Sequence, residues 1–260
     1  MSEKVRHILS LSGGKDSTAL AVYMRDRVPE MEYVFCDTGK ELKETYDYLH
    51  KIEAFLGKKI VVLNSDMDFD HWLEMFGGYL PSPQARWCTR KLKIVPFENY
   101  VGEDAVYSYI GIRADEDREG YISAKTNIKP VYPFKEDGLV KEDVFRILEE
   151  SGLGVPEYYK WRTRSGCYFC FFQRKSEWVG LMEHHPDLFE QAKQYEKYDE
   201  DSDRWYTWSQ GETLMELAGR ASTVKENSAT AVSRQRGTLF DLYADDDDAE
   251  LGSPCLICEL

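Results

Sequence analysis

A run of small, hydroxyl-bearing and charged residues near the N-terminus has the make-up of a phosphate-binding loop: Ser12-Gly13-Gly14-Lys15-Asp16-Ser17. An apolar segment, residues 7–11, precedes it, and a helical pattern over residues 18–26 follows it. In the order strand, glycine-rich turn and helix, the backbone can approach a ligand closely, and amide N–H groups at the positive end of the helix dipole face an anion. Lys15 adds a positive charge and the two serines add hydroxyl donors. The run therefore predicts a phosphate cradle.

The alternative for this run is an ordinary glycine-containing turn between a strand and a helix. It is not a Walker A loop, because that motif ends in Gly-Lys-Ser/Thr after four intervening residues and here Asp16 follows the lysine. The complete string in its strand-turn-helix setting favours nucleotide binding over the plain turn.

Polar residues also accompany the ends of two later apolar segments. Asp37-Thr38-Gly39 follows residues 31–36 directly, and Gly111 lies near the end of residues 105–112. The carboxyl ends of parallel strands meet at one edge of a sheet, so these residues can converge with the loop. The residues expected to bind the nucleotide are Ser10, Ser12, Gly13, Gly14, Lys15, Asp16, Ser17, Asp37, Thr38, Gly39, Gly111 and Arg113, and those expected to be catalytic are Lys15, Asp16, Ser17 and Arg113.

Arg113 comes directly after the last of these apolar segments. Its forked donors suit a phosphate group, and an ion pair with Asp115 or Glu116 is the alternative role. Asp16 and Asp37 are candidates for contacts to Mg²⁺ or to a ribose.

Six cysteines occur, and their spacing suggests metal or redox chemistry. Two Cys-x-x-Cys pairs and two isolated cysteines are unlike a disulfide framework, and structural disulfides are rare in a cytoplasmic chain. Cys36 lies within an expected strand, where a buried structural thiol is the expected role. The other five are Cys88, Cys167, Cys170, Cys255 and Cys258.

Alternating strand and helix patterns must position these residues. Apolar segments at residues 7–11, 31–36 and 59–64 are separated by helical patterns, the second of which ends at Gly57. This order predicts an α/β fold with a doubly wound, mainly parallel sheet, helices on both faces and a helical C-terminal part. We divide the chain into residues 1–178, with the loop and the central cysteines, and residues 179–260, a helical extension with a mobile acidic tail.

Two further segments are expected to be extended or mobile. Residues 130–134 should form a rigid extended stretch. Residues 221–236, rich in Ser, Thr, Lys and Arg, should be mobile or ordered by a partner.

The charge of the chain limits its partners. A formal net charge of −14 argues against a general surface for polyanions, but basic residues cluster locally at 86–93 and at 160–175. Neither a run of about 18 apolar residues nor a signal-peptide pattern is present, so we expect a cytoplasmic protein without a membrane span.

Five strings, in chain order, resemble the adenylyl-sulfate and phosphoadenylyl-sulfate reductase family, which shares its fold with the N-type ATP pyrophosphatases. They are residues 12–17, 37–39, 88–91, 111–116 and 166–170. The resemblance covers most of residues 7–178. It implies an adenine-nucleotide α-hydrolase-like fold, ATP and Mg²⁺ as cofactors, and attack on the α phosphorus of the nucleotide.

One cysteine of the family pattern is replaced. Adenylyl-sulfate reductases look to hold a [4Fe–4S] cluster with a Cys-Cys pair and a later Cys-x-x-Cys, and here Trp87 stands at the first position of the pair. The resemblance therefore leaves one iron open, and it implies three metal ligands: Cys88, Cys167 and Cys170. A zinc site is the alternative, with Cys255 or Cys258 as the fourth ligand; this second pair could instead relay persulfide sulfur.

The end of the chain also differs from the reductases, whose catalytic thiol lies in a Glu-Cys-Gly-Leu/Ile-His tail. The whole pattern looks more like the ATP-pyrophosphatase component of DNA phosphorothioation systems. That resemblance implies adenylylation of a DNA phosphate, a cysteine desulfurase as sulfur donor, and DNA bound directly or through another protein. We expect the basic cluster at residues 160–175 to contact the DNA, and a homodimer is one state of assembly to be considered. The alternatives are an assimilatory reductase that uses thioredoxin, a transfer-RNA thiolase, and a regulatory nucleotide-binding module without turnover.

Overall fold

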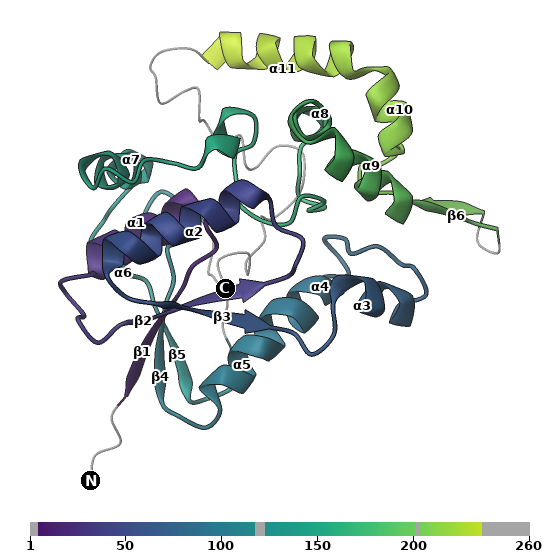
Figure 1. Ribbon diagram of the computed structural model, residues 1–260. Coiled ribbons are helices and arrows are strands. Elements are labelled where there is room, and N and C mark those ends of the chain that lie inside the picture. Colours follow the sequence, from purple (N-terminus) through teal and green to yellow (C-terminus); the bar gives the residue numbers. More distant parts are fainter. Residues whose placement is uncertain (1–4, 118–122, 201–202, 236–260) are drawn as a thin grey trace.

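A five-stranded parallel sheet forms the centre of the computed structural model, which describes residues 5–117, 123–200 and 203–235 (Figure 1). The strands are β1 Arg6–Ser10, β2 Glu32–Asp37, β3 Ile60–Asn64, β4 Val106–Tyr109 and β5 Ile128–Val131. Their spatial order is β3-β2-β1-β4-β5, and each neighbouring pair runs parallel. The order reverses between β1 and β4, so the expected doubly wound fold is confirmed, with its switch point at the end of β1.

Helices cover both faces of the sheet, because alternate residues of each strand point to opposite sides. On one face lie α1 (Lys15–Met24), α2 (Lys43–Leu56), α6 (Pro133–Glu136) and α7 (Lys141–Glu150). They bury a core that includes Leu9, Leu20 and Phe35. On the other face, the π-helix η1 (Arg90–Ile94) and α5 (Val95–Val101) pack on Ile8 and Val34.

A third core joins the segments after β2 and β3 to the C-terminal part of the chain. Its buried members are rich in aromatic side chains, among them Phe69, Trp87, Phe169, Trp178 and Trp208. The elements around it are α3 (Phe69–Met75), α4 (Trp87–Thr89), the 3-10 helix η2 (Glu157–Lys160), α8 (Lys175–His184), α9 (Pro186–Tyr195), α10 (Leu214–Gly219) and α11 (Ala221–Gln235). A hairpin of β6 (Lys197–Asp199) and β7 (Arg204–Tyr206) projects from it (Figure 1).

The two segments expected to be extended or mobile contain regular elements. Residues 130–134 are divided between β5 and α6, and Pro130 is tolerated because β5 is an edge strand. The expected mobility of residues 221–236 is wrong over Ala221–Gln235, which form α11 and bury Val224 in the third core. Packing against α8 stabilises this helix, which its polar composition does not predict.

Three other expectations concern the C-terminal tail, the division of the chain and a membrane span. The acidic run 245–248, Cys255 and Cys258 lie outside the described residues. The expected division after residue 178 falls within α8. Within the described ranges, no helix is both long enough and apolar enough to cross a membrane.

Candidate active site

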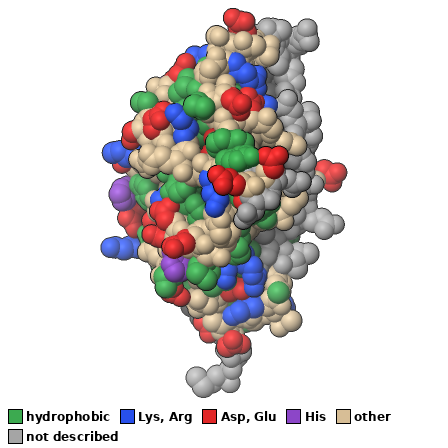
Figure 2. Space-filling view, turned by 90° about the vertical axis from the view of Figure 1, so that its right-hand side faces the viewer, with side chains coloured by type: hydrophobic (Ala, Val, Ile, Leu, Met, Phe, Trp, Pro, Cys, Tyr) green, Lys and Arg blue, Asp and Glu red, His purple; other side chains and the backbone are tan. Residues whose placement is uncertain are grey.

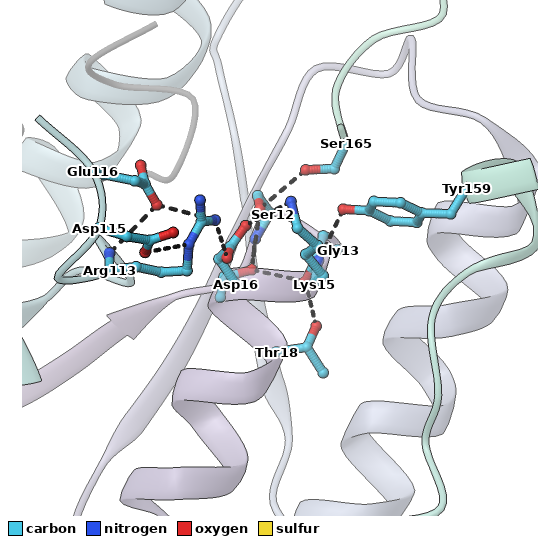
Figure 3. A network of polar contacts seen from close by, with 12 residues as sticks. Ser12, Gly13, Lys15, Asp16, Thr18, Arg113, Asp115, Glu116, Tyr159 and Ser165 are labelled. Atoms are coloured by element: carbon cyan, nitrogen blue, oxygen red, sulfur yellow. Dashed lines mark hydrogen bonds and ion pairs between the residues drawn. The ribbon is translucent and has the colours of Figure 1, made fainter. Parts of the chain in front are cut away.

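The glycine-rich run forms the turn from β1 into α1 at the switch point of the sheet (Figure 3). The helix begins at Lys15, rather than at residue 18 as the periodicity predicts, and Gly14 is its N-cap. The hydroxyls of Ser12 and Ser17 lie 3.0 Å apart, and the Ser12 amide donates to Ser17 Oγ at 3.1 Å. The turn is therefore closed by its own serines, at the positive end of the α1 dipole.

Two glycines allow the close approaches that this turn requires. Gly13 has φ +71°, and a Cβ there would lie 2.6 Å from Thr45 Cγ2. A Cβ on Gly111 would lie 3.1 Å from the carbonyl oxygen of Asp16. Gly111 therefore lets the segment after β4 pack directly against the start of α1.

Lys15, Asp16 and Arg113 form a buried charge network beside the turn (Figure 3). Asp16 accepts contacts from Lys15 Nζ at 3.2 Å and from Arg113 Nη1 at 2.8 Å. Burial acts to raise the pKa of Asp16, but the two cations outweigh it and hold that pKa well below its usual value. Arg113 also pairs with Asp115 at 3.0 Å and Glu116 at 3.1 Å, so the alternative ion-pair role is present.

These cations can change partners when a ligand arrives. Lys15 and Arg113 are only 5% and 6% exposed, and a buried cation is stable only when it is paired. The phosphates of a nucleotide could replace Asp16 as their partner without leaving either charge unpaired.

The end of β2 has a different geometry from the one expected at a nucleotide. Asp37 Oδ1 accepts hydrogen bonds from the Gly39 amide at 2.8 Å and from the Tyr46 hydroxyl at 2.7 Å, so this carboxylate shapes the turn. Ser10, at the end of β1, is 2% exposed, and its hydroxyl has no hydrogen-bond partner in the described parts of the chain. A bound ligand or water could satisfy it.

The three central cysteines line one pocket, which we call the cysteine pocket. Cys88 comes from α4, whereas Cys167 and Cys170 come from the loop before α8. Burial raises the pKa of Cys88 to about 11 and that of Cys167 well above its ordinary value. Both thiols are therefore protonated near neutral pH. The remaining wall is largely aromatic and includes Phe69, Phe169, Phe171, Phe172 and Trp208.

Charged and hydroxyl groups form one edge of the cysteine pocket. The Cys167 thiol donates to Glu41 Oε1 at 3.6 Å, and the Thr38 hydroxyl donates to the same oxygen at 3.0 Å. Burial alone would lower the pKa of Lys93, but Glu41 and the nearby thiols outweigh it and raise that pKa. Thr38, expected at the nucleotide, therefore lies beside a thiol, with its oxygen 3.1 Å from Cys167 Sγ.

Trp87, which stands where the family pattern has a cysteine, is a core residue. It is 8% exposed and stacks on Phe69 and Phe76 with ring centroids 5.1 Å away in each case. Its indole N–H donates to the carbonyl oxygen of Tyr79 at 3.0 Å. The large ring thus supports the aromatic wall of the cysteine pocket from behind.

The cysteines do not match a single-ion site. Within residues 5–117, 123–200 and 203–235, no three His, Cys, Asp or Glu side chains are grouped so that they could hold a metal ion. Zinc requires sulfur atoms about 2.3 Å from the metal, which brings the thiolates close together. The three cysteines therefore share one pocket without the close grouping that a single ion needs.

Sequence reasoning missed a set of hydroxyls over the phosphate-binding loop. Tyr158, Tyr159 and Ser165 contact Gly13, Lys15 and Ser12 respectively. Their position shortly before Cys167 is the signal that could have identified them, since that loop must bring the cysteine to the same sheet edge.

The basic cluster at residues 160–175, expected to contact DNA, is partly buried. Arg162 is 1% exposed, and it donates to the carbonyl oxygens of Gly166 and Cys167 at 3.0 and 2.9 Å. Its guanidinium holds the turn before the cysteine pocket, so it is not available to a nucleic acid. On the face shown in Figure 2, basic and acidic side chains are interspersed.

The curated relatives of this chain include proteins of uncharacterised function. A protein of Methanocaldococcus jannaschii is 30% identical over 207 residues, which are 74% of this chain and 48% of that protein. A second protein of that organism is 26% identical over 204 residues, 72% of this chain and 41% of its own length. A nin region protein of Escherichia phage lambda is 26% identical over 208 residues, 67% of this chain and 68% of that protein. The chain thus spans about half the length of the two Methanocaldococcus relatives.

A solved structure and a family model agree on the fold. The phosphate complex of phosphoadenylyl-sulfate reductase from Candida auris superposes with a TM-score of 0.50, covering 63% of this chain and 82% of that chain at 15% identity. The model of the phosphoadenosine phosphosulfate reductase domain matches residues 6–137, about half of this chain. That range includes the phosphate-binding loop, Arg113 and Cys88. The chain therefore belongs to the phosphoadenosine phosphosulfate reductase domain family.

Proposed function

We propose that this protein is an ATP pyrophosphatase that adenylylates a nucleic-acid phosphate, with the DNA backbone as the favoured acceptor, to prepare it for sulfur incorporation. One observation carries the proposal: a short segment joins the two candidate sites. Ser165 contacts Ser12 of the phosphate-binding loop at 3.1 Å, and Cys167, two residues later, lines the cysteine pocket. Activation of an oxygen and its replacement by sulfur require a nucleotide and a sulfur carrier at one centre.

The phosphate-binding loop would hold the β and γ phosphates of ATP. The turn amides, Lys15 and the Ser17 hydroxyl are the donors, and Mg²⁺ would neutralise further phosphate charge. Arg113 would stabilise the charge that develops near the α phosphorus. An acceptor phosphate oxygen would form the new bond to that phosphorus as the bond to pyrophosphate breaks.

The cysteine pocket would serve the second half of the reaction. Cys88, Cys167 and Cys170 are the residues that would hold a [4Fe–4S] cluster, and a cluster with three protein ligands supplies one iron with an open position for sulfide. Lys93 would offset negative charge on the sulfur groups beside it. The outer sulfur of a desulfurase persulfide would form the new bond to the acceptor phosphorus as the bond to AMP breaks. A thiol reductant would then cleave the remaining S–S bond, which leaves the phosphorothioate and a mixed disulfide on the donor.

The acceptor is expected to reach this centre with help from another protein. The chain carries a net charge of −14, and Arg162 of the expected contact is buried. A DNA-binding partner would therefore supply most of the contact to the phosphate backbone. A cytoplasmic setting would keep the thiols reduced.

Sulfonucleotide reduction is the second candidate, and the family match favours it. In that reaction thioredoxin would supply electrons and sulfite would be released from adenylyl sulfate or phosphoadenylyl sulfate.

The test combines both reactions in one anaerobic assay. The full chain is incubated with MgATP, a short DNA duplex, a cysteine desulfurase, cysteine and a thiol reductant, and pyrophosphate, AMP and DNA phosphorothioate are measured. All three products are expected with the wild type. Without the desulfurase, pyrophosphate should still be released in the adenylylation step, but DNA phosphorothioate should not form. Sulfite from a sulfonucleotide with thioredoxin, without pyrophosphate from ATP, would show the reductase instead. ATP binding without pyrophosphate from any acceptor would indicate a regulatory module.

A further inference from the structure

The segment before Cys167 covers the donors of the phosphate-binding loop; we call residues 158–167 the covering segment. The Lys15 amide donates to the Tyr159 hydroxyl at 3.0 Å, and the Ser165 hydroxyl donates to Ser12 Oγ at 3.1 Å (Figure 3). Both partners in the loop are groups that would bind a phosphate. The hydroxyl oxygens of the covering segment therefore occupy positions that phosphate oxygens require.

Little space remains between the loop and the covering segment. A Cβ on Gly14 would lie 2.6 Å from Ser165 Oγ and 3.3 Å from the Tyr159 hydroxyl. Because a gap narrower than a methyl group excludes a phosphate group, the segment in this position and a phosphate above Gly14 are mutually exclusive.

The covering segment is braced as one unit. Arg162 donates from its side chain to the carbonyl oxygens of Gly166 and Cys167, and its own amide donates to the carbonyl oxygen of Tyr158 at 2.9 Å. A second tie joins Thr163 to Glu177 of α8, with bonds of 2.7 and 2.8 Å. A displacement at one end is therefore passed along the segment to Cys167.

We propose that Tyr159 and Ser165 are positioning residues through which a nucleotide phosphate moves Cys167. The phosphate displaces their hydroxyls from Lys15 and Ser12, the covering segment shifts as a unit, and Cys167 changes its place in the cysteine pocket. Sulfur chemistry is thereby linked to an occupied nucleotide site. The inference rests on the proposed function for the identity of the ligand. It does not depend on the chemistry proposed at the α phosphorus.

The first experiment measures affinity by titration calorimetry, with ATP and with inorganic pyrophosphate as probes for the full chain. Tyr159→Phe keeps the ring and removes the competing hydroxyl, so both probes should bind about 3- to 10-fold more tightly. Ser165→Ala should act in the same direction. Tyr100→Phe is the matched control, since its hydroxyl donates to Glu32 at 2.8 Å outside the candidate site. Unchanged or weaker binding by Tyr159→Phe would overturn the proposal, because a direct contact or a merely structural role gives no gain.

The second experiment follows amide hydrogen exchange of residues 158–170 in the full chain. Saturating ATP should raise exchange in the wild type, whereas Tyr159→Phe should exchange faster without ligand and respond less to it. Equal exchange with and without a bound probe would overturn the coupling. If pyrophosphate binds and raises exchange but ATP does not bind, the coupling stands and the proposed function fails. If ATP is turned over while exchange stays the same, the proposed function stands and the coupling fails.

Discussion

The phosphate-binding loop and the cysteine pocket share one segment of chain but differ in construction. The loop consists of consecutive residues. Its Lys15 and Asp16 form an ion pair with each other, and Asp16 also pairs with Arg113. The cysteine pocket collects Cys88 from α4 and Cys167 from the loop before α8. Aromatic walls surround its thiols, and burial rather than pairing raises their pKa values.

This difference indicates how each site responds to change. In the loop, a bound phosphate would replace one charged partner by another, so the loss of one charge should affect the proposed nucleotide step strongly. In the cysteine pocket, protonated thiols must lose protons before they bind a metal, so the loss of one thiol should affect the bound group and spare the nucleotide.

The largest expected effect is on the loop alone. Lys15→Ala should lower pyrophosphate release by about 100- to 1000-fold, because the variant lacks the charge next to the transferred group. Iron content and the far-ultraviolet circular dichroism spectrum should match the wild type. A rate near that of the wild type would remove Lys15 from the catalytic residues.

The converse change affects the cysteine pocket alone. The wild type, purified anaerobically, should hold about four iron and four sulfide per chain, and Cys88→Ala should reduce both towards background. Its affinity for ATP should stay within about 2-fold of the wild type, because Cys88 is not part of the loop. Cys36→Ala is the control, since that thiol lies buried in β2 at 2% exposure. Two iron or fewer in the wild type, or stoichiometric zinc, would contradict the open cluster.

Glycine substitutions test how tightly the loop is packed. Gly13→Ala should reduce the free energy of unfolding by about 2–5 kcal/mol, because it combines a positive φ with a clash against Thr45. Gly39→Ala has a similar φ of +68° but meets nothing within 4 Å in the described structure, so about 1–2 kcal/mol is expected. Urea unfolding measures both, and equal losses would show that the loop yields to the added methyl group.

The smallest expected effect is a difference between the two sites in how their contribution to stability depends on pH. The pKa of Asp16 is lowered to about 2, so its ion pairs contribute fully to the stability of the fold above the ordinary carboxyl pKa. This contribution is lost as the pH falls from the ordinary carboxyl pKa towards about 2. The stability difference between the wild type and Asp16→Asn should therefore narrow from about pH 5 to about pH 2. In metal-free protein, Cys88→Ala should show no such narrowing, because burial raises the pKa of the Cys88 thiol and keeps it protonated throughout this range. A constant difference for Asp16→Asn would place its effect in packing.

Much of the fold could be predicted from local patterns. The βαβαβ order, the turn at Ser12–Ser17 and the end of α2 at Gly57 all depend on residues that are neighbours in sequence. The α11 helix escaped prediction because its polar composition resembles a mobile segment, and packing against α8 stabilises it. The burial of Arg162 could not be predicted either, since a basic residue in a basic cluster is usually exposed.

The candidate site likewise combines features that the sequence predicts with features that only the tertiary structure decides. The types and spacing of residues 12–17 were enough to predict a glycine-rich turn between a strand and a helix, since its geometry depends on glycine torsions and on the start of one helix. Which groups face that turn is a property of the tertiary structure. Tyr159 over Lys15, Thr38 beside Cys167 and Trp87 in the aromatic core are contacts between residues far apart in the chain. They are decided by how the third core packs against the sheet edge, and no local pattern carries that information.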